Sequence, residues 1–300
     1  MNEITVNWKE YFDNSCKGED SWGHYKTANG DLYVVVDGVS SHDGSRTGAD
    51  VARFIDDILK EAAPNIESSR ELREVIYAIN TISSRINKGA YAALAGILVS
   101  GVKVYSFSAG DVAIIGKKAN GKLIQVLPLD LNVTREEAEA LAKMKFGALD
   151  KDAKINQQNV EQRIRQYMHH GLSNAIGIGD TFLLHEKKFT ARDKSAILIA
   201  TDGITDPFIA PQSEAGTVPK AGAPKLYRVI NTNQNAEGAA NALGEMVWDT
   251  QVKEGIKIKS DDRTALFIYM DSPAKEYTKW ISDLLDLTHS TDTDTGNNRN

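Results

Sequence analysis

The sequence predicts an α+β protein in which antiparallel strands and helices share one layered αββα core. Between Ala92 and Pro128, four apolar segments follow one another with connections as short as Ser100-Gly101. Connections this short cannot hold a crossover helix, so neighbouring strands must run antiparallel, which excludes a doubly wound dinucleotide-binding fold for this half of the chain. Helical patterns precede and follow the strands, and no composition break marks a linker. We therefore expect one domain over residues 1–287 and a disordered tail over residues 288–300.

The elements before these strands are predicted from apolar spacing. The first clear strand is Leu32 to Val36, which ends at Asp37-Gly38. Gly48 to Ala62 has helical periodicity and is closed by Pro64. A second helix is expected to begin with the capping box Ser68-x-x-Glu71. Its apolar stripe is predicted to consist of Leu72, Val75, Ile76, Ile79, Ile82 and Ile86.

The second half of the chain alternates between polar segments and further strands. Residues 132–173 are polar and helical in pattern, and we expect a flap-like excursion there. Residues 207–235 hold four of the seven prolines and are interpreted as an irregular Pro-rich loop. The remaining expected elements are strands at Thr181 to His185, Ala196 to Thr201 and Thr264 to Met270, a helix from about Ala236 to Gln251, and an amphipathic helix after Pro273.

Composition and charge restrict the classes of function. The chain has 35 basic and 41 acidic residues and a net charge of −6, which argues against nucleic acid as a partner. Cys16 is the only cysteine, so no intrachain disulfide and no cysteine-based zinc site can form, which fits a reducing compartment. No apolar run reaches the length of a membrane span, and the N-terminus lacks a signal-peptide pattern. We expect a cytoplasmic protein without membrane partners.

Acidic residues stand at the ends of several predicted strands. Two strongly apolar segments end alike, at Asp37-Gly38 and at Asp202-Gly203. Asp-Gly is also a preferred hairpin turn, but neither pair is followed at once by a second strand pattern. Asp261-Asp262 precedes the last strand, and Glu19-Asp20 could add a further ligand. Such carboxylates are hard oxygen donors suited to Mg²⁺ or Mn²⁺, although spacing alone does not join them into one site.

The order of these motifs resembles the metal-dependent protein phosphatase family, also called PPM or type 2C, and its bacterial-type Ser/Thr members. The resemblance is collinear from about Gly18 to Met270. The six matching motifs are Gly18-Glu19-Asp20, the Asp37-Gly38 segment from Val34 to Ala52, Ser108-Ala109-Gly110-Asp111, Asn174-Ala175-Ile176-Gly177, Thr201-Asp202-Gly203-Ile204 and Asp261-Asp262-Arg263-Thr264.

The resemblance implies a four-layer αββα sandwich, two antiparallel sheets flanked by helices, with two Mg²⁺ or Mn²⁺ ions in a cleft at one end. Asp37 would bridge both ions. The ligands implied by motif are Glu19, Asp20, Asp37, the carbonyl of Gly38, Asp202 and Asp261, with Asp111 for a possible third ion. A water of lowered pKa between the ions would attack the phosphorus of a phosphomonoester.

The resemblance also implies a function and two further candidate residues. The chain would be a phosphoserine/phosphothreonine protein phosphatase acting on phosphorylated proteins, with a Ser/Thr kinase as a possible cognate partner. Ser15 replaces the family's phosphate-binding arginine, so Lys17 becomes the candidate phosphate-binding cation. His42 could protonate the leaving alkoxide, or it could be a solvated loop histidine. The alternative function is a catalytically weak phosphatase-like module that regulates or binds phosphoproteins; a metal-dependent nuclease is disfavoured by the acidic charge.

Overall fold

The computed structural model describes residues 4–41, 45–118, 121–130, 172–191, 196–208, 223–252 and 261–271 of the chain. Several expectations lie outside these residues. They are the position of His42, nearly all of the flap-like excursion, the middle of the Pro-rich segment, the helix after Pro273 and the tail.

Two five-stranded antiparallel sheets form the centre of the molecule. Sheet A has the order β1 (Thr5–Asp13), β10 (Arg263–Asp271), β9 (Ala196–Ala200), β6 (Ala113–Lys117) and β7 (Leu123–Gln125). Sheet B has the order β2 (Asp20–Thr27), β3 (Gly30–Val39), β4 (Tyr91–Ser100), β5 (Lys103–Ala109) and β8 (His185–Thr190). Every paired ladder in the two sheets is antiparallel, as the short connections predicted.

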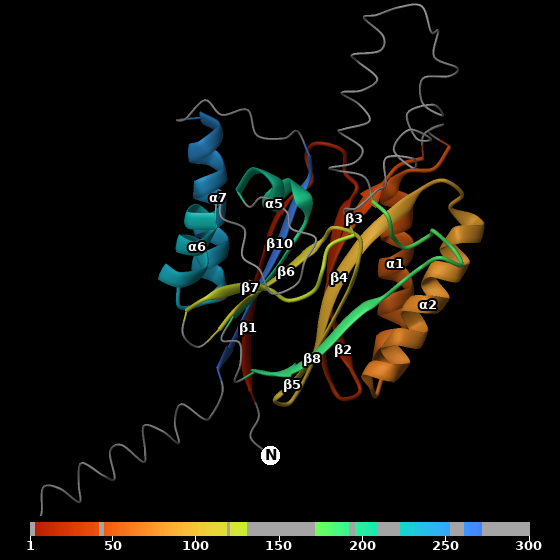
Figure 1. Cartoon of the computed structure of the whole chain (residues 1–300), viewed down its shortest axis with the longest axis horizontal. Helices are drawn as coiled ribbons and strands as arrows, with labels where there is room; N and C mark the ends of the chain where they lie inside the picture. Colours follow the sequence, from red (N-terminus) through yellow and green to blue (C-terminus); the bar gives the residue numbers. More distant parts are fainter. Residues whose placement is uncertain are drawn as a thin grey trace, which may run out of the picture.

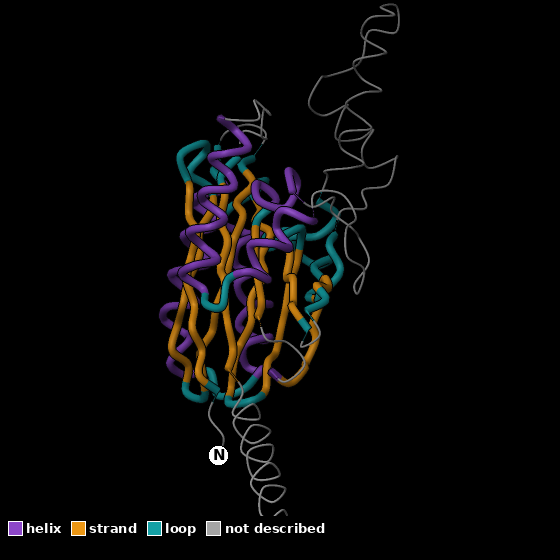
Figure 2. Tube along the Cα trace, turned by 90° about the vertical axis from the view of Figure 1, so that its left-hand side faces the viewer, coloured by secondary structure: helices purple, strands orange, loops and turns teal. Residues whose placement is uncertain are grey.

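Helices cover the outer face of each sheet (Figure 1). They are α1 (Gly48–Ala62), η1 (Ala63–Asn65) and α2 (Ser69–Ile86) on sheet B, and α6 (Ala223–Thr232) and α7 (Ala236–Val252) on sheet A. A short helix, α5 (Asp202–Phe208), lies near the upper end in Figure 1. The strands run roughly along one direction, so that loops gather at the two ends of the sandwich (Figure 2). The predicted four-layer αββα arrangement is confirmed.

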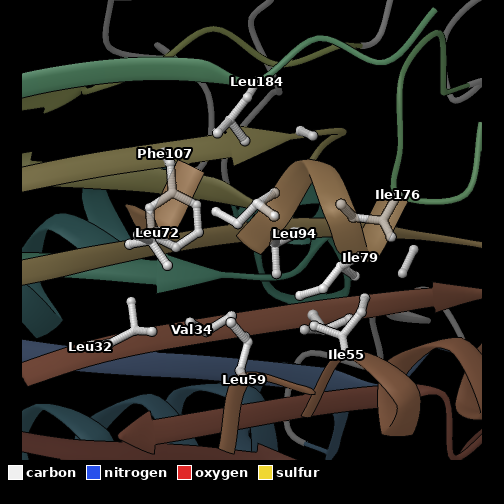
Figure 3. Close-up of a cluster of buried hydrophobic side chains, with 14 of the residues drawn as sticks. Leu32, Val34, Ile55, Leu59, Leu72, Ile79, Leu94, Phe107, Ile176 and Leu184 are labelled. Carbon is white, nitrogen blue, oxygen red and sulfur yellow. The ribbon is translucent and has the colours of Figure 1, made fainter. Parts of the chain in front are cut away.

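The central strands are apolar without interruption because both of their faces are buried. In β3, Leu32 and Val34 pack against α1 and α2 in the cluster that Figure 3 shows. Tyr33 and Val35 point the other way and join the core between the two sheets. Leu32, Tyr33 and the three valines before Asp37 therefore pack into two hydrophobic layers at once, and they fix the position of that carboxylate.

The helix α2 confirms the capping box and corrects the predicted stripe. The Ser68 hydroxyl accepts a hydrogen bond from the Glu71 amide, and the Glu71 carboxylate accepts one from the Ser68 amide. Leu72, Ile76 and Ile79 are buried, as the periodicity predicted. Ile82 and Ile86 are 43% and 47% exposed. The last turns of α2 therefore do not bury the stripe that the sequence predicted there.

Three further expectations were wrong. β1 and β2 precede the strand that the sequence analysis took as the first. The strand expected at Thr181 to His185 begins only at His185 and runs to Thr190 as β8. Part of the expected Pro-rich loop is helical, because α6 spans Ala223–Thr232. Among the helices that the structure describes, none is both long and apolar enough to cross a membrane.

Candidate active site

Four acidic segments meet at the end of the sandwich where α5 begins. Asp20 opens β2 and lies directly opposite Asp37 in the antiparallel register of β2 and β3. Asp202 is the first residue of α5 and follows β9, while Asp261 precedes the neighbouring strand β10. The Thr201 amide donates to the Thr264 carbonyl at 3.0 Å, which ties the ends of β9 and β10 together. The fold thus assembles residues that are more than 200 positions apart in sequence.

Electrostatics show that these carboxylates act on one another. Burial raises the pKa of Asp37 well above its ordinary value, and the negative charges of neighbouring carboxylates raise it further. These neighbours are Asp20, Asp202, Asp111 and Asp261. The candidate residues that sequence spacing could not join therefore form one cluster around Asp37.

Asp20 links the two sheets from a buried position. Its Oδ2 accepts hydrogen bonds from the hydroxyls of Thr201 at 3.0 Å and Thr264 at 2.8 Å, while only 6% of the residue is exposed. Burial raises its pKa to about 7, although the two threonine hydroxyls act to lower it and the charges of Asp262 and Asp202 add to the rise. Asp20 thus joins β2 of sheet B to the edge of the site formed by sheet A.

The glycines of both Asp-Gly pairs are required by close backbone contacts. A Cβ on Gly38 would lie 2.5 Å from the carbonyl carbon of Gly48 and 2.7 Å from the carbonyl oxygen of Glu19. A Cβ on Gly203 would lie 1.9 Å from the carbonyl oxygen of Asp262. The structure shows that these glycines admit other segments of the chain, which bring Glu19 to Asp37 and Asp262 to Asp202.

Glu19 and Lys17 approach the cluster from the loop before β2. The Glu19 Oε1 accepts hydrogen bonds from the Ser40 hydroxyl and, at 3.1 Å, from the Gly48 amide. The Lys17 ammonium lies 2.8 Å from Oδ1 of Asp261 and is half exposed. Burial acts to lower the pKa of Lys17, but the hydrogen bond to Asp261 and the charges of Asp261, Asp37 and Glu19 raise it overall. Lys17 therefore brings positive charge to an otherwise acidic site.

Asp111 follows the turn that leads from sheet B to sheet A. It is buried, and Gly110 before it has a φ of 95°, in the left-handed region that favours glycine. The Gly110 amide donates to Oδ2 of Asp130 at 2.9 Å, and the same oxygen accepts from the Asn174 side chain at 2.8 Å. Oδ1 of Asp130 lies 2.7 Å from Nε2 of His185. Asp130 thus holds the turn that presents Asp111.

Sequence reasoning did not assign the supporting roles of several residues at the site. Asp130, His185, Thr201, Thr264 and Asp262 all contribute side-chain hydrogen bonds near the carboxylates. The buried Thr201 stands directly before one Asp-Gly pair, and Thr264 stands two positions after Asp262. A threonine at a strand end beside acidic residues was the one available signal, but its partner, Asp20, cannot be identified from spacing.

The donor set suits a hard divalent cation, although it is not arranged as a closed coordination shell. Within the described ranges, no three His, Cys, Asp or Glu side chains form a ready metal-holding group. Some of the carboxylate oxygens instead accept hydrogen bonds from the protein. Lys17 donates to Asp261, and the Ser40 hydroxyl donates to Glu19. The charges that raise the pKa of Asp37 nevertheless all belong to carboxylates, which are the ligands that Mg²⁺ and Mn²⁺ prefer.

Comparisons with known proteins agree with the fold. The family model described as Protein phosphatase 2C matches residues 13–247. No curated protein gives a significant match to the sequence. Solved structures share the fold at low sequence identity. The serine/threonine phosphatase Stp1 from Staphylococcus aureus is 16% identical, with 89% of this chain and 96% of that chain covered and a TM-score of 0.62.

Two other solved structures show the same likeness of fold. PppA, described as a key regulatory component of T6SS in Pseudomonas aeruginosa, is 15% identical with a TM-score of 0.59, and 90% of this chain and 100% of that chain are covered. The catalytic domain of the serine threonine protein phosphatase PstP, in complex with two manganese ions, is 14% identical with a TM-score of 0.56. That match covers 89% of this chain and 99% of the other.

Proposed function

Since the chain belongs to the protein phosphatase 2C family of metal-dependent protein phosphatases, we propose that its carboxylate cluster binds two Mg²⁺ or Mn²⁺ ions for hydrolysis of phosphoserine and phosphothreonine. The observation that carries this proposal is the set of four carboxylates whose charges raise the pKa of half-buried Asp37 at the end of the sandwich. Burying like charges together is unfavourable unless a cation compensates them. Nothing in the described part of the chain favours the alternative of a catalytically weak binding module.

The proposed ligands follow the fold and the family motifs. Asp37 would lie between both ions, with Glu19 and the carbonyl of Gly38 on one of them. Asp202 and Asp261 would hold the other ion. The contacts in the structure support this division, because Gly38 packs against Glu19 and Gly203 packs against Asp262, beside Asp261. Ions bound there would supply a water of lowered pKa and would neutralise charge on the phosphoryl oxygens.

Asp20 and Asp111 complete the proposed set in different ways. Oδ2 of Asp20 already accepts two threonine hydroxyls, so a cation would be bound through Oδ1. Asp111 is proposed for a third ion, since its charge acts on Asp37 from the turn held by Asp130. His42 remains a proposed proton donor to the leaving alkoxide, supported only by its place in the family motif.

We also propose that Lys17 binds the substrate phosphate. Its ammonium is half exposed and lies on Asp261, so a small side-chain rotation would turn it toward a phosphate at the site. As a point charge it would attract phosphate without the bidentate geometry of arginine. The substrates are proposed to be phosphoproteins made by a cognate Ser/Thr kinase, in the cytoplasm; the single cysteine is consistent with that compartment.

The first test is hydrolysis of p-nitrophenyl phosphate and a phosphothreonine peptide with Mn²⁺, with Mg²⁺ and with EDTA. Turnover is expected with either metal, and EDTA and the Asp202→Asn variant are expected to abolish it. Mn²⁺ binding without any turnover would contradict the proposed catalysis and favour a regulatory module.

The role of Lys17 is tested with Lys17→Met and Lys17→Arg. Loss of a charge-assisted hydrogen bond predicts a rise of about tenfold or more in KM for the phosphopeptide in Lys17→Met. Lys17→Arg should keep a KM near that of the wild type. An unchanged KM in Lys17→Met would contradict the phosphate-binding role.

A further inference from the structure

Two adjacent aspartates before β10 face different surroundings. Asp261 lies on the Lys17 ammonium and contributes to the charge around Asp37. Asp262 is 1% exposed, and its carboxylate faces the loop of residues 16–19. The proposed metal site uses Asp261 and leaves Asp262 without an assigned role.

The Asp262 carboxylate accepts hydrogen bonds from three backbone amides of one loop. Oδ1 accepts from the amides of Cys16 at 3.0 Å and Lys17 at 2.8 Å, and Oδ2 accepts from the amide of Glu19 at 2.8 Å. The distances are typical of strong hydrogen bonds to a charged acceptor. Both oxygens are needed, because an asparagine would offer one acceptor oxygen and turn an NH₂ donor toward the remaining amide.

The backbone of Asp262 is also held in place by contact with Gly203, the glycine of the second Asp-Gly pair. The Asp262 carbonyl oxygen would lie 1.9 Å from a Cβ on Gly203, so the backbones of these two residues are in direct contact. The amide of Asp262 donates to Oδ1 of Asp261 at 3.1 Å. Asp262 therefore connects the segment that carries Asp202 and Asp261 to the loop that carries Lys17 and Glu19.

We propose that Asp262 is a positioning residue that holds Glu19 and Lys17 in place for the metal ions and the substrate phosphate. It binds the loop through backbone amides, so its effect does not depend on the side chains of residues 16–19. This inference rests on the proposed function, since Glu19 and Lys17 are assigned to that site. According to this inference, the site requires a carboxylate at position 262 although that residue contacts neither the metal ions nor the substrate.

The test compares Asp262→Asn with the wild type and with Asp31→Asn. Asp31 serves as the control because its carboxylate, which is partly buried, also accepts hydrogen bonds, from His24 and Lys26. It lies six residues before Asp37 on β3, about 20 Å away along the strand. Mn²⁺ binding to the metal-free protein is measured by titration calorimetry, and amide exchange at residues 16, 17 and 19 is measured by NMR.

Asp262→Asn is expected to weaken Mn²⁺ binding by about tenfold or more and to raise KM for a phosphothreonine peptide, whereas Asp31→Asn should change neither. Amide exchange should speed up either at Glu19 or at Cys16 and Lys17, depending on which way the new amide group turns. Unchanged exchange and unchanged Mn²⁺ affinity in a folded Asp262→Asn would overturn the inference.

Two outcomes separate this inference from the proposed function. If the wild type binds no Mn²⁺, the proposed function fails, and this positioning role fails with it whatever the exchange rates. If the wild type binds Mn²⁺ and Asp262→Asn binds it equally well, only the inference fails. Asp262→Ser, which leaves room for water beside the amides, is the second variant. If neither variant folds, Asp262 is needed for folding rather than for positioning the site, and the inference is wrong.

Discussion

Gly203→Ala perturbs the site by a single methyl group, which would be added where the backbones of Gly203 and Asp262 are in closest contact. The new Cβ would lie 1.9 Å from the Asp262 carbonyl oxygen, while ordinary contacts begin at 3.4 Å. The β9 end and the β10 start must therefore separate by about 1.5 Å. Overpacking of this kind destabilises a protein by roughly 1–3 kcal/mol. The separation would also move Asp202 away from Asp261, and a displacement of about 1 Å at a catalytic site can lower the rate about 100-fold.

The assay measures kcat/KM for Mn²⁺-dependent hydrolysis of p-nitrophenyl phosphate well below the unfolding temperature, beside urea unfolding of the same protein. The control is Gly101→Ala in the β4–β5 hairpin. A Cβ on Gly101 meets nothing within 4 Å, but its φ of 55° makes alanine strained there by roughly 1–2 kcal/mol. Gly101→Ala should lose stability and keep its activity. The reasoning fails if Gly203→Ala keeps kcat/KM within threefold of the wild type.

Three further variants or conditions give defined outcomes. Asp37→Asn should abolish turnover. It should also raise the free energy of urea unfolding in EDTA at pH 7, because burial and nearby negative charge disfavour the ionised carboxylate of the wild type. A free energy of unfolding lower than that of the wild type would contradict this reasoning. Burial raises the pKa of Asp20 from 3.8 to about 7, so the folded state holds a proton that the unfolded state has released. Stability of the metal-free protein should therefore fall as the pH rises from about 4 to about 7, and the fall should be smaller in Asp20→Asn. Ser68→Ala removes the cap of α2 and should cost about 1 kcal/mol in thermal unfolding with turnover unchanged.

The fold could be predicted wherever a local pattern had one structural meaning. The short connection at Ser100-Gly101 allowed only an antiparallel pair, and the capping box at Ser68 marked a helix start. β1 and β2 were missed because edge strands bury little of each face, so their sequences alternate weakly. α6 was missed because prolines dominate the surrounding sequence, although Pro224 stands in its first turn, where proline is tolerated.

The candidate site was predictable only in part. The acidic residues and the glycines were visible in the sequence, because Asp37-Gly38 and Asp202-Gly203 follow apolar runs and precede no strand pattern. Their meeting around Asp37 depends on the register of β2 with β3 and on the pairing of β9 with β10, which no local pattern specifies. The role of Asp262 could not be predicted either, since its partners are backbone amides about 245 residues away.

The raised pKa values couple metal binding to proton release. Without a cation, burial and neighbouring charges raise the pKa of Asp37 well above its ordinary value and the pKa of Asp20 to about 7, so both carboxyls keep their protons to a higher pH than a free aspartate does. A cation requires ionised carboxylates, so its binding must displace protons that the metal-free site holds. The apparent affinity for Mn²⁺ should therefore rise with pH between about 6 and 8. Calorimetric titrations in buffers of different ionisation enthalpy measure the protons released. If no proton is released at pH 7, Asp37 and Asp20 are already ionised in the metal-free protein, and the cluster is more open to water than its burial indicates.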